Sequence, residues 1–306
     1  MNIVFMGTPE FAVPCLDALL KAGHQVSAVF TQPDKPKGRG YKLTPPPVKE
    51  LALQKNISVF QPTTLKDGVA LEEIKKVNPD LIVVVAYGKI LPKEILSFPK
   101  YGCVNVHASL LPKYRGAGPI QWSILNGEEE TGVTTMYMAE GLDAGDMLEK
   151  EAIRIGENET ADELHDRLSE LGAKLIVSTV EKLENKEITP VKQNDQESSY
   201  APMLSKELSL IDFKESAKKV HNLIRGLSSW PCANTFYEGK RLKIYRSEIV
   251  DLSGKPGEIL DDKRFIIACG DKAIRAIVVQ YEGSKKMSSE DFLRGKSLKK
   301  GEILGG

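Results

Sequence analysis

At 306 residues, the chain suits two domains of about 100 to 200 residues each. Its composition, 41% apolar and 27% charged, is typical of a soluble globular protein, and its longest apolar run, residues 81–86, is far shorter than the roughly 20 residues of a membrane span. The net charge of zero is unevenly distributed: residues 1–205 carry −6 (22 Lys and Arg against 28 Asp and Glu), and residues 206–306 carry +6 (20 against 14). A polyanionic partner for the C-terminal part and an ordinary solvated surface explain this asymmetry about equally well.

The cysteines and the N-terminus bear on the compartment. Cys15, Cys103, Cys232 and Cys269 stand far apart without a CxxC pair, which argues against a disulfide framework and against a zinc site. We expect buried thiols in a reducing cytoplasm. The N-terminus has no basic region ahead of its apolar residues, so we expect no signal peptide and a cytoplasmic protein.

The first part of the chain alternates between strand and helix patterns. Short apolar runs predict strands, and amphipathic periodicity predicts the helices between them. The expected strands are residues 3–6, 26–31, 80–86 and 101–107, and the expected helices are residues 9–23, 48–54 and 65–77. This order indicates βαβ units and predicts an α/β domain with a doubly wound, mostly parallel sheet.

In the rest of the chain, the predicted secondary-structure pattern changes at two places. Two more strands are expected, at residues 132–138 and 146–155, followed by a long helix that starts with a capping box of Thr160 and Glu163. Residues 186–205 lose periodicity and are interpreted as including a linker. Beyond it we expect one amphipathic helix and then hairpins that form a small β-barrel or sandwich; the elements are residues 213–227, 238–240 and 270–272. The predicted domains are therefore residues 1–189 and 206–306, joined by residues 190–205.

The first strand-to-helix turn argues against a dinucleotide-dependent dehydrogenase. Residues 6–10 read MGTPE where a dinucleotide-binding fold has GxGxxG. Only Gly7 is present, and Pro9 removes an amide donor that a phosphate would need.

Two polar residues interrupt a strand that is otherwise apolar. Asn105 and His107 are two residues apart in the expected strand 101–107, so both side chains project from one face. They lie near its carboxyl end, where open α/β sheets place their ligands. A hydrogen-bonded pair in the core is the structural alternative, because an unsatisfied buried polar group costs about 1 to 3 kcal/mol.

Two later segments add candidate residues. Residues 109–120, SLLPKYRGAGPI, contain many small or conformationally fixed residues, which predicts a loop of defined shape. Asp143 lies in the glycine-bounded segment EGLDAGD between two expected strands. Taken alone, an Asp in such a loop is more often a turn residue than a functional one.

Together these motifs resemble the folate-dependent formyltransferases, which share an Asn, His and Asp catalytic set in this order and spacing. The resemblance implies that Asn105, His107 and Asp143 are catalytic and that 10-formyltetrahydrofolate is the formyl donor. It also implies a Rossmann-like formyltransferase domain with a C-terminal OB-like barrel. It assigns seven residues to the folate site, the last three as the wall of the pterin pocket: Ser109, Leu110, Leu111, Pro112, Lys89, Ile90 and Leu91.

The chemistry of these side chains agrees with that resemblance. Formyl transfer from nitrogen to an amine passes through a tetrahedral carbon that bears an oxyanion. Asn105 can donate an amide N–H to this oxygen, as can His107 when it is protonated or in a suitable tautomer. Asp143 can orient His107 and help to move the proton of the attacking amine. No metal or covalent enzyme intermediate is required, and Cys103, on the same face, is expected only to pack.

The acceptor is predicted from a different segment. Residues 32–47 carry four cations against one acid, which suits a loop along an RNA backbone but also an ordinary surface loop. The segment is similar to an insertion of the methionyl-tRNA formyltransferases, and the similarity implies that Arg39 helps to recognise the acceptor stem. Lys37 and Lys42 are candidate tRNA contacts beside it.

The C-terminal part resembles the OB-like barrel of the same family, and OB folds commonly bind nucleic acids. The implied substrate is methionyl initiator tRNA, and the implied oligomeric state is a monomer. Candidate phosphate contacts are Lys206, Lys218, Lys219, Lys240, Arg241, Lys243 and Arg246. Two alternatives remain: a 10-formyltetrahydrofolate-dependent enzyme that acts on a small-molecule amine, and a tRNA-binding protein without catalysis. The first needs no basic C-terminal domain, and the second leaves Asn105, His107 and Asp143 without a role.

Overall fold

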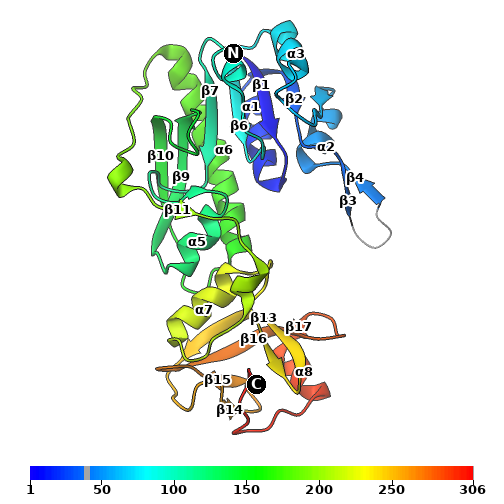
Figure 1. Ribbon diagram of the computed structural model, residues 1–306, viewed down its shortest axis with the longest axis vertical. Helices are drawn as coiled ribbons and strands as arrows, with labels where there is room; N and C mark the ends of the chain where they lie inside the picture. The colour runs from blue at the N-terminus through cyan, green and yellow to red at the C-terminus, as the bar shows by residue number, and fades with distance from the viewer. Residues whose placement is uncertain (38–41, 306) are drawn as a thin grey trace. The chain divides into compact units, whose positions relative to one another are not determined.

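The computed structural model describes residues 1–37 and 42–305, which form two compact units (Figure 1). Unit 1 comprises Met1–Gly116, Gly132–Ile153 and His165–Tyr200, and unit 2 comprises Ala117–Thr131, Arg154–Leu164 and Ala201–Gly306. The chain passes between the units more than once, so two short stretches that precede residue 165 pack with the C-terminal residues.

Unit 1 is built on a seven-stranded sheet with the order β10-β9-β7-β6-β1-β2-β5. Strands β5, β2, β1, β6 and β7 are parallel, and β9 runs antiparallel to β7, which confirms the predicted mostly parallel α/β sheet. The strands of the sheet are β1 (Asn2–Gly7), β2 (Gln25–Phe30), β5 (Ser58–Phe60), β6 (Leu81–Val85), β7 (Cys103–His107), β9 (Glu130–Tyr137) and β10 (Met147–Arg154). Two short pairs lie outside the sheet: β3 (Lys35–Lys37) with β4 (Lys42–Thr44), and β8 (Arg115–Gly116) with β11 (Tyr200–Ala201).

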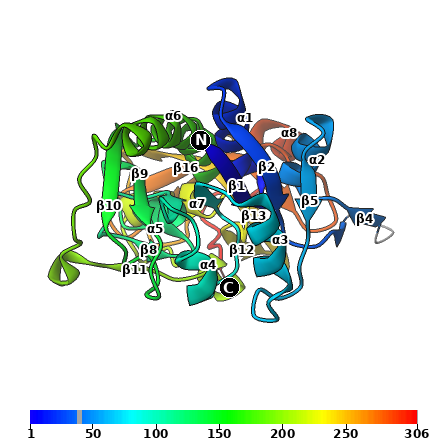
Figure 2. The same ribbon diagram turned by 90° about the horizontal axis from the view of Figure 1, so that it is seen from above.

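Helices cover both faces of this sheet (Figure 2). They are α1 (Val13–Lys21), α2 (Pro47–Gln54), α3 (Val69–Val77), α4 (Lys93–Leu96) and α6 (Ala161–Asn185), with 3₁₀ turns at Glu10–Ala12 and Asp195–Glu197. Figure 2 shows α1 and α6 over one face and α3 over the other. On β7, Val106 lies against Gly172 of α6, whereas the Cys103 thiol is 3.7 Å from the Ile95 carbonyl oxygen of α4. Strand alternation therefore directs Asn105 and His107 away from α6, toward the α3 and α4 side.

Two predicted helices start later than their apolar patterns suggested. Helix α3 begins at Val69 rather than Leu65, because Gly68 has a φ of +82° and does not continue a right-handed helix backward. In unit 2, α7 begins at Ala217 rather than Phe213, because the Ser216 hydroxyl accepts the Lys219 N–H as an N-cap. Leu65 and Phe213 are nevertheless buried, so the apolar pattern of the core begins several residues before each helix starts.

The expected capping box and the expected burial of the cysteines are both confirmed. The Thr160 N–H donates to the Glu163 carboxylate at 2.9 Å and the Glu163 N–H to the Thr160 hydroxyl at 3.4 Å, which is the expected capping box. All four cysteines are buried and free, and burial raises the pKa of the Cys103 thiol to about 12, so a thiolate is disfavoured there. Among the helices of the described residues, none has the length and apolarity needed to cross a bilayer.

Unit 2 contains a six-stranded antiparallel sheet with the order β12-β13-β16-β15-β14 and β17 paired to β16. The hairpins at 238–240 and 270–272 are both present, joining β12 to β13 and β15 to β16, and they confirm an OB-like C-terminal β domain. The elements are α5 (Pro119–Leu125), a 3₁₀ turn (Lys206–Ser209), α7 (Ala217–Gly226), β12 (Asn234–Tyr237), β13 (Lys240–Val250), β14 (Ile259–Asp261), β15 (Ile266–Ala268), β16 (Ala273–Tyr281), β17 (Met287–Ser288) and α8 (Ser289–Gly295).

A buried polar network ties α7 to residues 154–164 within unit 2. The His221 ring nitrogens lie 2.9 Å from the Ser247 hydroxyl and 3.0 Å from the Glu157 carbonyl oxygen. The buried Arg225 guanidinium donates to the carbonyl oxygens of Gly156 and Glu159. A carbonyl oxygen only accepts, so Nε2 of His221 carries the hydrogen, and neutral His221 accepts the Ser247 hydroxyl at Nδ1.

We expect this network to make unit 2 sensitive to acid. Burial holds the pKa of His221 below its ordinary value of 6.5, and the charge of Arg225 acts in the same direction. The unfolded chain therefore binds this proton at a higher pH than the folded chain, so the free energy of unfolding should fall as pH falls below about 6.5.

Urea unfolding followed by tryptophan fluorescence measures this effect. Both tryptophans, Trp122 and Trp230, belong to unit 2, so the signal reports the unfolding of that unit, whereas His24, whose pKa burial also lowers, belongs to unit 1. His221→Gln keeps a neutral donor and should unfold with a weaker pH dependence than the unsubstituted protein. Equal slopes would contradict the role of His221.

Candidate functional site

Asn105, His107 and the residues predicted for the folate site lie at or after the carboxyl ends of β6 and β7 in the sheet of unit 1. Strands β1, β6 and β7 are adjacent and parallel, so their carboxyl ends meet at one edge. The loops at residues 86–92 and 108–114 leave from the last two of these strands. In open α/β sheets this edge is where ligands bind.

His107 ends β7 and is held by the loop that follows it. Its Nε2 lies 2.8 Å from the Tyr114 carbonyl oxygen, and the side chain is buried. Because a carbonyl oxygen accepts and does not donate, Nε2 carries a hydrogen, and this assigns the tautomer of the neutral ring. Nδ1 is left without a hydrogen in the neutral ring, and it is the nitrogen that faces Asp143 at 3.6 Å.

Asp143 sits in the loop between β9 and β10. Its φ of +48° is in the left-handed region that Asp and Asn tolerate better than most residues, as a turn residue would require. Its carboxylate also acts outside the turn, because Oδ2 accepts the Gly116 N–H at 2.9 Å while lying 3.6 Å from His107 Nδ1. The latter distance is too long for a direct hydrogen bond, and the carboxylate would attract Nδ1 only when that nitrogen carries a proton.

Asn105 lies on β7 two residues before His107, so both side chains leave the same face of the strand. Its pairing partner on β6 is Val84, near the end of that strand. Asn105 is half-buried, and its side-chain amide makes no hydrogen bond to the residues within 1–37 and 42–305. Its N–H groups and oxygen are therefore available to a ligand.

Two residues of this site were not predicted. The Gln193 side-chain amide donates to the carbonyl oxygens of Asp143 and Gly145, both at 2.8 Å. Arg115 Nε in turn donates to Gln193 Oε1 at 3.0 Å. Residues 190–205 were interpreted as a linker, and nothing in their composition distinguishes Gln193 from the polar residues around it. The shaped loop that contains Arg115 was recognised, but not which of its residues would hold the Asp143 loop.

The residues assigned to the folate site divide into those that shape loops and those that present surface. Ser109 is fully buried and donates its hydroxyl to the Lys113 carbonyl oxygen, and the Leu111 N–H donates to the Thr134 hydroxyl at 3.1 Å. These two residues shape the 109–112 loop, whereas Leu110 and Pro112 are half-buried and keep surface for a ligand.

The second group lies in the loop after β6. Lys89 directs its ammonium to the carbonyl oxygens of Pro62 and Thr63, and Leu91 is buried, so neither side chain is free. Ile90 is 82% exposed, which is unusual for a large apolar side chain and provides a surface that a flat ring can cover.

The candidate tRNA residues of unit 1 belong to a short hairpin. Lys37 ends β3 and pairs with Lys42 at the start of β4, so part of the segment expected as a loop is a two-stranded ribbon. Arg39 lies outside the described residues.

Unit 2 carries the candidate phosphate contacts of the C-terminal part. Lys219 pairs with Glu215 at 2.9 Å, and Arg246 pairs with Glu163, so these two cations are already partly neutralised. Five others form no ion pair within the described part of the chain and are the better candidates: Lys206, Lys218, Lys240, Arg241 and Lys243.

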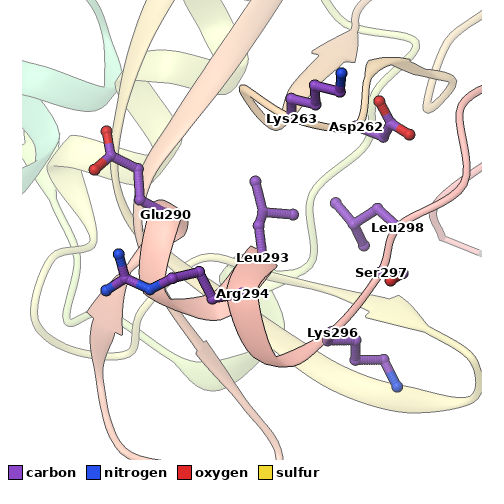
Figure 3. A pocket seen from close by; sticks show the side chains of 8 residues that line it. All are labelled: Asp262, Lys263, Glu290, Leu293, Arg294, Lys296, Ser297 and Leu298. Atoms are coloured by element: carbon purple, nitrogen blue, oxygen red, sulfur yellow. The ribbon is translucent and has the colours of Figure 1, made fainter.

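Unit 2 also contains a depression of about 400 Å³ between α8 and the β14–β15 turn (Figure 3). Figure 3 shows Glu290 and Arg294 along its α8 side. Arg294 pairs with Asp291, and Lys296 with Glu238 at 2.6 Å, whereas Lys263 forms no ion pair within the described part of the chain. Two acidic side chains, Asp262 and Glu290, also line the depression, so its charges are mixed.

Two protein-family models match this chain. Residues 1–180 match the formyl transferase family, and residues 203–297 match the formyl transferase C-terminal domain. Among solved structures, an N-formyltransferase from Helicobacter canadensis in complex with folinic acid and dTDP-3-aminofucose has a TM-score of 0.70 at 24% identity, over 90% of this chain and 98% of that one. HypX from Aquifex aeolicus, solved with tetrahydrofolic acid, has a TM-score of 0.67 at 20% identity; 96% of this chain matches 47% of HypX. These two likenesses show the fold.

Curated relatives are much more similar. A methionyl-tRNA formyltransferase of Alkaliphilus oremlandii is 55% identical over 100% of both chains. Another, of Caldanaerobacter subterraneus subsp. tengcongensis, is 54% identical over 99% of this chain and 100% of the relative. The chain therefore belongs to the methionyl-tRNA formyltransferase family.

Proposed function

We propose that the chain transfers a formyl group from 10-formyltetrahydrofolate to the α-amino group of methionyl initiator tRNA, giving formylmethionyl-tRNA for translation initiation. It acts in the cytoplasm, as a monomer. The proposed acceptor is supported by the sequence identity of 55% to a methionyl-tRNA formyltransferase over the full length of both chains. The site at the carboxyl end of β7 supports the reaction type, because its groups suit a step in which negative charge develops on an oxygen.

His107 and Asn105 are proposed to act on the formyl oxygen. Nε2–H of His107 is used by the Tyr114 carbonyl oxygen, so only Nδ1 can serve the substrate. A neutral ring accepts the proton of the attacking amine there, and the resulting imidazolium can donate Nδ1–H to the oxygen that becomes negative. When the tetrahedral intermediate collapses, the bond between the formyl carbon and the folate nitrogen breaks, and the imidazolium returns its proton to that nitrogen. Asn105, whose amide is otherwise unused, provides the second donor.

Asp143 is proposed to hold the protonated form of His107. Its carboxylate is shielded and fixed by the Gly116 N–H, so it opposes the imidazolium from a set position 3.6 Å away. Opposite charges at this separation in a partly buried site attract more strongly than in bulk water. Asp143 is therefore placed to stabilise the imidazolium that forms when Nδ1 takes the proton of the amine.

The folate is proposed to bind along the loops after β6 and β7, where it supplies the formyl group. Exposed Ile90 lies in one loop, and Leu142, which is 59% exposed, lies in the loop of Asp143. Lys93, the first residue of α4 directly after the first loop, forms an ion pair of 3.9 Å with Glu140 of the second loop. Two large apolar side chains exposed to water on these loops are suited to contact the flat faces of a pterin ring.

The tRNA is proposed to contact both units. Arg39, with Lys37 and Lys42 on the ribbon of β3 and β4, is assigned to the acceptor stem. The unpaired cations of unit 2, among them Lys240, Arg241 and Lys243, are assigned to backbone phosphates, which is consistent with the net charge of +6 over residues 206–306. Such contacts release counterions, so they should weaken as salt rises.

Incubation with 10-formyltetrahydrofolate and one acceptor at a time tests this function. We expect formylmethionine after deacylation when the acceptor is methionyl initiator tRNA, and no product with free methionine or with a nucleotide-linked amino sugar. Formylation of the amino sugar alone would support the small-molecule alternative instead. Binding of tRNA without turnover would support a non-catalytic protein.

A salt titration in the same assay examines the assigned contacts. The logarithm of tRNA affinity should fall linearly with the logarithm of salt concentration, and Lys243→Gln should reduce the slope by about one. Glu215→Gln is the matched control, because it releases Lys219 from its ion pair and should not reduce the slope. An unchanged slope for Lys243→Gln would remove that residue from the interface.

A further inference from the structure

The Gln193 side chain of the connecting segment 190–205 forms hydrogen bonds to the loop of Asp143. Val191 and Met147 exchange both backbone hydrogen bonds at 2.8 Å, which places the segment beside the start of β10. Two residues later, the Gln193 amide nitrogen donates to the carbonyl oxygens of Asp143 and Gly145. A primary amide has two N–H groups, so both are used on this loop.

The orientation of this amide follows from its neighbours. Two carbonyl oxygens lie at its nitrogen, and the Arg115 guanidinium donates to its oxygen. The reversed orientation would place the amide oxygen against both carbonyls and the NH₂ group against a cation. Arg115 is itself fixed, because its Nη2 donates to Asp195 Oδ1 at 2.8 Å and its side chain is only 14% exposed.

These contacts close a ring around Asp143. The Gly116 N–H holds its carboxylate, Arg115 precedes Gly116 in the chain, Arg115 holds Gln193, and Gln193 holds the Asp143 carbonyl oxygen. The left-handed backbone conformation of Asp143 is energetically unfavourable, and it persists because surrounding contacts offset its cost. The ring therefore controls both the backbone and the carboxylate of the residue that faces His107 Nδ1.

We propose that Gln193 is a positioning residue for the reaction, holding Asp143 at its distance from His107, so that this one residue of the connecting segment belongs to the active site. The proposal rests on the proposed role of Asp143. Gln193 touches no substrate in it and acts only through the Asp143 loop. Misplacement of a catalytic group by about 1 Å can lower turnover by about 10²-fold, which sets the scale of the effect.

Gln193→Glu is the sharpest test, because it keeps the size of the side chain and its partner Arg115 but places a carboxylate against two carbonyl oxygens. We expect kcat to fall about 10- to 100-fold with near-normal KM for both substrates. Part of the loss should be recovered at lower pH, where the introduced carboxyl group is protonated and can donate one hydrogen bond. The matched control is Gln196→Glu, the same exchange on an exposed residue of the same segment, which should leave kcat and the pH profile unchanged.

A double-substitution cycle separates positioning from a general loss of structure. If Gln193 acts through Asp143, adding Gln193→Glu to Asp143→Asn should cost much less than it costs alone. Gln193→Leu, of similar size and without hydrogen bonds, should reproduce the loss in kcat without the recovery at low pH. Wild-type kcat in both Gln193 variants, or fully additive losses in the cycle, would overturn the proposal. Turnover of the unsubstituted protein is the separate measure of the proposed function.

Discussion

His107→Gln is expected to lower kcat for formyl transfer by about 10²- to 10³-fold, the usual loss when one donor to a developing oxyanion is removed. The substitution is informative because the two ring nitrogens have separate tasks. A Gln amide nitrogen can reach the position of Nε2 and donate to the Tyr114 carbonyl oxygen, so the 108–114 loop keeps its anchor. No atom of Gln replaces Nδ1, the nitrogen that faces Asp143.

Two further substitutions at His107 complete the comparison. His107→Asn places an amide nitrogen near the position of Nδ1 but leaves the Tyr114 carbonyl oxygen unpaired, so it should retain more turnover than Gln and less stability. His107→Ala loses both contacts and should be as inactive as Gln. Single-turnover kinetics and tRNA binding are the measurements, with tRNA affinity close to wild type in all three. Near-normal kcat in His107→Gln would exclude Nδ1 from the chemistry.

The features of this site that could be predicted are those that a short stretch of sequence contains. Asn105 and His107 stand out because polar residues are costly on a buried strand, and strand alternation alone places them on one face. The capping box of Thr160 and Glu163 is of the same kind, since both partners lie within four residues. Local rules are sufficient for such features because the backbone fixes the geometry.

Other contacts have no local signature. Gln193 lies 50 residues from Asp143 along the chain, and a side-chain amide that meets a backbone carbonyl oxygen needs no particular residue type there. The same reason explains why α5 and residues 154–164 were not assigned to unit 2. Their place in unit 2 depends on packing against other elements; α5, for example, packs against α7 where Leu125 meets Gly226. Apolar periodicity cannot predict such packing, because it describes only one face of one helix.

Helix starts were wrong for a related reason. Apolar periodicity reports which residues reach the core, and Leu65 and Phe213 do reach it. Whether the backbone is helical at those residues depends on the cap, and Gly68 and Ser216 set the true starts. A cap signal therefore decides a helix boundary better than the last buried residue does.

Asp143→Asn is expected to lower kcat by about 10²- to 10⁴-fold, the range typical of lost proton-transfer assistance, while the protein stays close to wild-type stability. Asn tolerates the left-handed conformation at this position, and its side-chain oxygen can still accept the Gly116 N–H. Only the negative charge opposite His107 Nδ1 is lost. The loss should appear in kcat and in the pH profile, with little change in the affinity for tRNA.

Asp143→Ala supplies the contrast that decides between a catalytic Asp and a turn residue. Ala loses the hydrogen bond to Gly116, worth about 1.5 to 3 kcal/mol for a charged acceptor, and is disfavoured at a φ of +48° by about 1 to 2 kcal/mol. If Asp143 only makes a turn, Asn should behave like wild type and Ala should lose stability alone. If its charge supports His107, both variants should lose turnover, and only Ala should unfold earlier in urea. The difference in stability between the two variants therefore measures the structural role of Asp143. The loss of turnover that they share measures the contribution of its charge.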